Sequence, residues 1–101
     1  MAYGLKQDDL ERIKQVFAAH PKVKEVILFG SRAMGSYDTG SDIDLAIAGN
    51  DLALTDILDL SHDLERLDML YSFDVQALDS ITDKEVLAHI HRVGKTIYAL
   101  R

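Results

Sequence analysis

Residues 30–45 read GSRAMGSYDTGSDIDL and decide the fold of this chain. They lie between the apolar runs VILF at 26–29 and LAI at 45–47, so a Gly-Ser turn ends one predicted strand and two aspartates begin the next. Asp42 and Asp44 point to the same face of that strand, because side chains alternate along a strand with a period of two. Adjacent carboxylates repel each other unless a cation lies between them, so the stretch predicts a divalent-metal site.

The length of the chain predicts one small domain over residues 1–101, and its 48% of hydrophobic residues is enough to form a core. A net charge of −6 argues against direct nucleic-acid binding, which relies on clustered Lys and Arg. The chain has no cysteine, so disulfides and thiolate metal sites are excluded. The first residues lack the pattern of a signal peptide, and no apolar run approaches the length of a membrane span. We therefore expect a cytoplasmic protein that does not bind a membrane.

Hydrophobic periodicity predicts helices at 8–19, 52–67 and 83–93, and strands at 23–29, 42–48 and 72–78. Asp8 with Glu11 and Thr82 with Glu85 have the spacing of capping boxes at two helix starts. Ser31 is placed to cap a short helical turn over 32–34, and the tail at 96–100 is either a short strand or an extended apolar clamp. This order predicts an α/β (α+β) fold with a small mixed sheet of three to four strands flanked by helices. The first two strands can pair as neighbours, and the third can pair parallel after a full helix.

A third acid, Asp74, lies on a predicted strand whose other face is apolar. If that strand lies beside the one that carries Asp42 and Asp44, the three carboxylates converge, and such oxygen ligands suit Mg²⁺ or Mn²⁺. Gly30 allows a phosphate to approach the backbone closely, and Ser31 offers a hydroxyl and an N–H donor. Carboxylates on one side and donors on the other predict a site for a nucleoside triphosphate.

These residues match a known pattern. Gly30-Ser31, ten further residues and then Asp42-Ile43-Asp44 resemble the signature of the DNA polymerase β-like nucleotidyltransferase superfamily. Within it, GSRAMG followed by SDIDL is similar to the minimal nucleotidyltransferases, the MntA-type antitoxins paired with HEPN-domain toxins. The resemblance runs from residue 23 to the tail and implies the polymerase β-like nucleotidyltransferase fold in one minimal domain.

The resemblance implies a role for each residue of the pattern. Asp42 and Asp44 would bind two metal ions, Mg²⁺ or Mn²⁺. Asp74 would complete the metal site and help to deprotonate the acceptor hydroxyl. Gly30 and Ser31 would hold the triphosphate of ATP, the substrate.

Arg32 occupies a position where the family often has arginine, and two interpretations stay open. It either contacts phosphate or braces the loop through an acid such as Asp38. No histidine is assigned to the site, since His89 and His91 are two apart on a predicted helix and cannot face one ligand together.

The activity that the resemblance implies is transfer of AMP from ATP to a tyrosine of a partner HEPN-type toxin, which inactivates the toxin. A chain of 101 residues leaves little room for an acceptor-binding domain, which also favours a partner protein. Two alternatives remain: a nucleotidyltransferase with a small-molecule acceptor, and a non-catalytic antitoxin that inhibits by binding alone. A polymerase is the weakest interpretation, because the acidic surface offers no track for a nucleic-acid strand.

Overall fold

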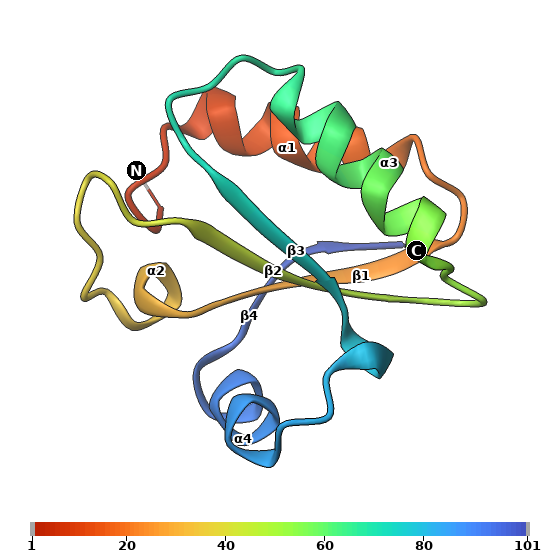
Figure 1. Cartoon of the computed structure of the whole chain (residues 1–101). Helices are drawn as coiled ribbons and strands as arrows, with labels where there is room; N and C mark the ends of the chain where they lie inside the picture. Colours follow the sequence, from red (N-terminus) through yellow and green to blue (C-terminus); the bar gives the residue numbers. More distant parts are fainter. Residues whose placement is uncertain (1, 101) are drawn as a thin grey trace.

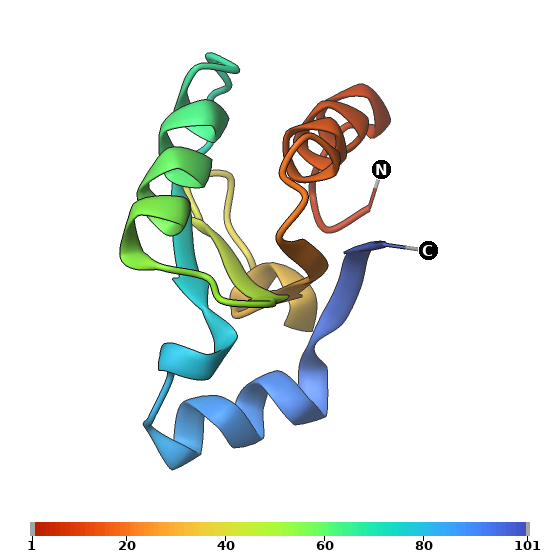
Figure 2. The same ribbon diagram turned by 90° about the vertical axis from the view of Figure 1, so that its right-hand side faces the viewer.

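The computed structural model describes residues 2–100, which form a mixed four-stranded sheet with helices on both faces (Figures 1 and 2). The strands are β1 (Val23–Phe29), β2 (Ile43–Gly49), β3 (Phe73–Ala77) and β4 (Lys95–Ala99), in the order β3-β2-β1-β4. The central strand β1 is antiparallel to both β2 and β4, and β3 is parallel to β2. The predicted mixed sheet and the parallel third strand are confirmed, and the tail is a strand. Residues 1 and 101, the ends of the predicted domain, lie outside the described part.

The helices divide between the two faces of the sheet. Helices α1 (Gln7–Ala18) and α3 (Leu54–Glu65) lie side by side on one face, and α4 (Lys84–Val93) lies on the other (Figures 1 and 2). The single turn α2 (Ser31–Met34) follows β1 directly, and the 3₁₀ turn η1 (Leu78–Ser80) follows β3. Within residues 2–100, no helix has both the length and the apolar character needed to cross a bilayer.

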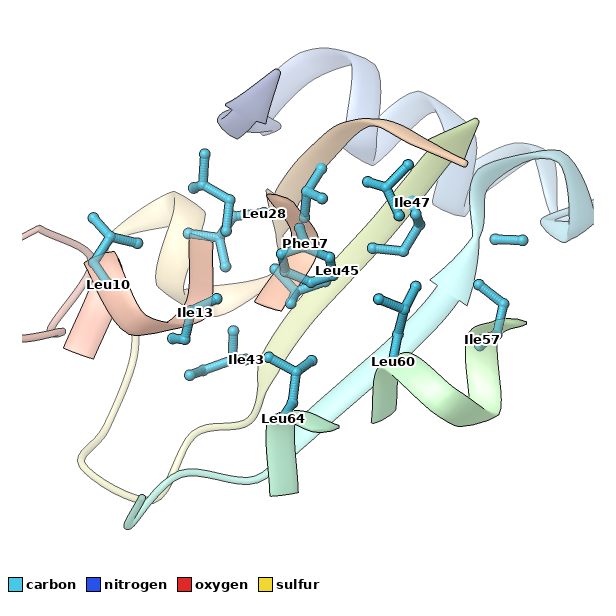
Figure 3. Packing of buried hydrophobic residues seen from close by; sticks show 14 of the residues in the cluster. Leu10, Ile13, Phe17, Leu28, Ile43, Leu45, Ile47, Ile57, Leu60 and Leu64 are labelled. Carbon is cyan, nitrogen blue, oxygen red and sulfur yellow. The ribbon is translucent and has the colours of Figure 1, made fainter. Parts of the chain in front are cut away.

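The alternation of β2 explains why both faces are covered. Ile43, Leu45 and Ile47 are buried against α1 and α3, in the larger core cluster. Figure 3 shows side chains of α1, α3, β1 and β2 meeting in this cluster, among them Leu10, Ile13, Phe17, Leu28, Ile57, Leu60 and Leu64. On the other face, Ala46 of β2 packs with Phe29, Ile81 and Ile90 in a smaller cluster beneath α4. Asp44 shares this second face, as predicted, because it is two residues from Ala46.

The two predicted capping boxes are wrong. Helix α1 begins after Lys6 without a side-chain cap, and Glu11 instead accepts a hydrogen bond of 2.9 Å from the Gln7 side chain. Helix α4 is capped by Asp83, whose carboxylate accepts from the backbone N–H groups of residues 85 and 86. The N–H of residue 85, which Thr82 would have bonded in the predicted box, is thus bonded by Asp83 instead. The cap lies one residue later than predicted.

Candidate active site

Strand register brings two of the predicted acids together. Asp44 of β2 is the direct Cα partner of Asp74 on the parallel strand β3, so both side chains lie on the same face of the sheet. On its other side Asp44 is paired with Phe29, the last residue of β1. Asp42 lies one residue before β2 begins, outside the strand to which it was assigned. The three acids therefore lie at the edge of the sheet where β1 ends and β2 and β3 begin, beside α2 (Figure 1).

Gly30 is required at this edge by its conformation and by its neighbour. Its φ is +77°, a left-handed conformation that side chains strongly disfavour. A Cβ atom at this position would also collide with Oδ2 of Asp44. The turn thus places the backbone of Gly30 directly against a candidate metal ligand.

Asp44 is a crowded acid, meaning that it is partly buried and lies close to two other carboxylates, Asp74 and Asp42. Its pKa is raised above the ordinary 3.8, first because burial disfavours the charged form, and then through repulsion by Asp74 and Asp42. A bound divalent cation would remove this repulsion, and carboxylate oxygens are the donors that Mg²⁺ and Mn²⁺ prefer. The chemistry of the donors therefore fits such an ion. No three His, Asp or Glu side chains of residues 2–100 form a ready-made metal cluster, so the assignment of Asp42, Asp44 and Asp74 as ligands stays a prediction.

The predicted helical turn is confirmed, but the capping role of Ser31 is wrong: Gly30 is the N-cap, no side chain caps the turn, and Ser31 is its first residue. The turn is closed by a 3.1 Å hydrogen bond from Met34 N–H to the Gly30 carbonyl and by a 3.0 Å bond from Ser36 N–H to the Ser31 carbonyl. Gly35 ends it with φ +85°. Ser31 is half-buried, and its hydroxyl is a potential donor. Phosphate binding by Gly30 and Ser31 stays a prediction.

Arg32 is a buried brace for the loop that leads to the acids. Its side chain is 2% exposed, and its Nε and Nη2 donate to the Ser41 carbonyl at 3.1 and 3.0 Å. Its Nη1 donates to the Tyr3 carbonyl at 2.9 Å. The guanidinium also lies 5.3 Å from the ring centroid of Tyr37 and 5.2 Å from that of Tyr71. The interactions of Arg32 thus fix the backbone immediately before Asp42.

The two interpretations of Arg32 can now be compared with its contacts. The loop is braced through a backbone carbonyl, and no acid within residues 2–100, Asp38 included, forms an ion pair with Arg32. Three of its five N–H donors are bonded to carbonyls, and a phosphate contact would require a side chain that is 2% exposed to become accessible. That contact therefore stays a prediction, and the bracing role is what the side chain performs in this structure.

His89 is a residue of this edge that the sequence interpretation missed. Its Nε2 accepts a 2.9 Å hydrogen bond from the Gly30 N–H, and its ring meets the ring of Phe29 edge-on, with centroids 6.2 Å apart. The spacing of apolar residues along this helix could have indicated that His89 faces the sheet. His89 lies three residues after Val86 and four before Val93, so it belongs to the apolar stripe of α4 that faces the sheet.

The chain matches the family described as Polymerase beta, Nucleotidyltransferase over residues 11–100. No curated protein sequence matches it significantly. Among solved structures, it is similar to a toxin–antitoxin crystallised with AMP-PNP, with 25% identity over 91% of this chain and 74% of that one, and a TM-score of 0.73.

Two further neighbours share the fold. The first is a tri-AMPylated HEPN toxin in complex with an MNT antitoxin from Shewanella oneidensis, with 23% identity over 95% of this chain and 74% of the other, and a TM-score of 0.70. The second is the toxin–antitoxin MntA–HepT, with 23% identity over 94% and 74%, and a TM-score of 0.68. The predicted polymerase β-like fold is confirmed, and the family match covers most of the chain. The chain belongs to the polymerase β nucleotidyltransferase family.

Proposed function

We propose that this chain is an antitoxin that transfers AMP from ATP to a tyrosine hydroxyl of a partner HEPN-type toxin, and that residues 1–101 act as one minimal nucleotidyltransferase domain. One observation carries the proposal: Asp44 and Asp74 are register partners on one face, and Asp44 abuts the glycine of the Gly-Ser turn. Such an edge combines anionic oxygen ligands with the donors of Ser31, the next residue of the turn. The proposal includes a cytoplasmic location, which the use of ATP supports.

Each residue has a defined task in the proposed reaction. The oxygen of the acceptor tyrosine attacks the α-phosphorus of ATP, the bond from that phosphorus to the bridging oxygen of the β-phosphate breaks, and pyrophosphate leaves. Asp74, which is exposed on the edge strand β3, accepts the hydroxyl proton. Ser31 donates to phosphate oxygens, and Gly30 keeps the turn free of a side chain. Asp42, Asp44 and Asp74 would hold Mg²⁺, which neutralises charge on the transferring phosphoryl group when it is bound.

The solved neighbours support the two finer parts of the proposal. The neighbour crystallised with AMP-PNP supports an adenine nucleotide as the substrate. The complex of a tri-AMPylated HEPN toxin with an MNT antitoxin supports a toxin as the acceptor and AMP as the group transferred. The acidic charge of this chain, −6, is unsuited to a nucleic-acid acceptor.

Labelled ATP distinguishes the proposal from its alternatives. The chain is incubated with Mg²⁺, ATP labelled at the α-phosphate and the protein encoded by the adjacent gene, and the products are separated by mass. We expect label on a tyrosine of the partner with the wild type, and none with the double variant Asp42→Asn, Asp44→Asn. The double variant Asp59→Asn, Glu65→Gln is the control, because both acids are exposed on α3 away from the edge and their substitution makes the same change of charge.

Each other outcome selects a different function. Label on a small alcohol added in place of the partner would assign the chain to small-molecule modification. Neutralisation of the partner that is equal for the wild type and for the double variant would make the chain an antitoxin that acts by binding. Label that persists on the partner in the double variant would overturn the roles given to the two aspartates.

A further inference from the structure

The Gly-Ser turn is held from two sides by residues distant from it in sequence. On one side, Oδ2 of Asp44 lies against the Cα of Gly30. On the other, the N–H of Gly30 donates to Nε2 of His89 on α4 at 2.9 Å. We propose that His89 is a positioning residue for nucleotidyl transfer, which fixes the Gly30 amide and thereby the geometry of Ser31 relative to Asp44. This inference rests on the transfer activity proposed above.

The need for such a residue follows from the glycine itself. Only glycine fits between the strand end and Asp44, but glycine is also the residue whose backbone is least restricted by its own sterics. The φ of +77° must therefore be maintained by contacts from outside the turn. A hydrogen bond to the Gly30 N–H fixes the peptide plane between Phe29 and Gly30, and Ser31 follows that plane directly.

The surroundings of His89 suit it to this task. The ring meets Phe29 edge-on, and the next residue, Ile90, is buried in the cluster that joins α4 to the sheet. The beginning of α4 is fixed by the Asp83 cap. The imidazole is thus carried on an anchored helix, and because the backbone N–H can only donate, its Nε2 is the acceptor and its other nitrogen, Nδ1, carries the proton.

The hydrogen bond to His89 also gives Gly30 and Ser31 different roles within the turn. Because the Gly30 N–H is already bonded to His89, it is not free to bind a phosphate. The donors left for a phosphate at this point are those of Ser31. Gly30 contributes its lack of a side chain, and His89 contributes the fixed direction of the turn.

Three variants of the full chain test the role, by two independent measurements. His89→Gln keeps an acceptor at a similar reach, His89→Leu removes it, and His91→Leu changes an exposed histidine of the same helix as the control. Hydrogen exchange of the Gly30 amide, followed by NMR, reports the hydrogen bond without any activity. The rate of AMP transfer to the partner at saturating ATP, together with the KM for ATP, reports the chemistry.

We expect His89→Leu to accelerate exchange of the Gly30 amide by at least about tenfold. The same variant should lower the transfer rate at saturating ATP by about 10- to 100-fold, since small displacements of positioned groups have effects of that size. His89→Gln should restore most of both, and His91→Leu should resemble the wild type. A variant that merely unfolds in part would lose amplitude in proportion to its unfolded fraction, and its folded remainder would keep the wild-type turnover.

Two results would overturn the proposal: a His89→Leu variant with wild-type exchange at Gly30, or transfer by His89→Gln that is impaired as strongly as by His89→Leu. If the wild type transfers no AMP at all, the proposed function fails by itself. The exchange of Gly30 and the binding of Mg²⁺–AMP-PNP measured by calorimetry then still decide whether His89 holds the turn.

Discussion

The carboxylate of Asp44 lies so close to the Cα of Gly30 that no side chain fits between them. The two residues are brought together by the antiparallel pairing of β1 with β2, in which Phe29, the residue before Gly30, is the partner of Asp44. This packing joins the turn assigned to phosphate with the strand assigned to metal, and it makes both halves of the site depend on one position.

Substitution of Gly30 by alanine should therefore be the most damaging glycine change in this part of the chain. It combines a strained positive φ with a collision against Asp44, and we expect it to lower the free energy of unfolding by about 2–4 kcal/mol. Urea denaturation measures this change. Gly35→Ala isolates the backbone strain, because Gly35 has φ +85° and open space around it, and should cost about 1 kcal/mol.

Gly40→Ala completes the series, because Gly40 has open space and no positive φ. It should leave the free energy of unfolding within about 0.5 kcal/mol of the wild type. Equal destabilisation by Gly30→Ala and Gly35→Ala would show that the contact with Asp44 contributes nothing.

Substitution of Arg32 by lysine should destabilise the fold although the charge is kept. A lysine ammonium cannot reproduce the paired donation to the Ser41 carbonyl together with the bond to the Tyr3 carbonyl, so a buried acceptor loses its partner. We expect a loss of about 2–4 kcal/mol in the free energy of unfolding, measured in urea. Arg12→Lys is the matched control: Arg12 is exposed and donates to one carbonyl, that of Leu67, so its loss should stay below about 1 kcal/mol.

Asp44 should reduce the stability of the metal-free protein at neutral pH. Its pKa is higher in the folded chain than the ordinary 3.8, so the folded state binds more protons, and stability falls as pH rises from about 3.8 through the folded pKa. Asp44→Asn should remove this slope and raise the melting temperature at pH 7 by about 2–4 °C, after allowance for solvent screening at this partly exposed site.

Calorimetric melts with and without Mg²⁺ test the same point. Mg²⁺ should stabilise the wild type and have little effect on Asp44→Asn, because the cation relieves the repulsion that the substitution removes. A metal-free variant that melts below the wild type across the acid-to-neutral range would contradict the assignment of Asp44 as a crowded acid.

Asp56 should act in the opposite direction, far from the site. Its pKa is lowered by the 2.8 Å hydrogen bond from the Ala53 N–H at the start of α3 and by Lys22 at 3.1 Å. Its stabilising contribution is present above the ordinary pKa of 3.8 and is lost as pH falls through the lower folded pKa. Asp56→Asn should lower the melting temperature at neutral pH, and the difference from the wild type should vanish in strong acid. Asp59→Asn, an exposed acid of the same helix, should show no such difference at either pH.

The element order and sheet face were predictable from local patterns. The alternation of Ile43, Leu45 and Ile47 with Asp44 specifies which side of β2 is buried, because a strand has a period of two. Helix caps were less predictable, since Thr82 and Asp83 are adjacent and either side chain can satisfy free N–H groups. In the structure, Asp83 is the N-cap.

The candidate site was predictable only in part. Gly30, Ser31, Asp42 and Asp44 are close in sequence and form a recognisable pattern, whereas Asp74 was a candidate on strand position alone. His89 is separated from Gly30 by 59 residues, so no local pattern could pair them. Arg32 belonged to the pattern, but the two partners of its guanidinium are carbonyls, and carbonyls are common to every residue.

By itself, then, the sequence determined the strands, the turn and the two acids on either side of Ile43, because these depend on side-chain periodicity and on the conformational freedom of glycine. Only the tertiary structure decided that Asp74 lies in register with Asp44, that Arg32 braces the backbone before Asp42, and that His89 holds the Gly30 amide. Each of these depends on the pairing and packing of segments far apart in the chain, and hydrogen bonds to backbone groups leave no trace in the identity of the residue that provides them.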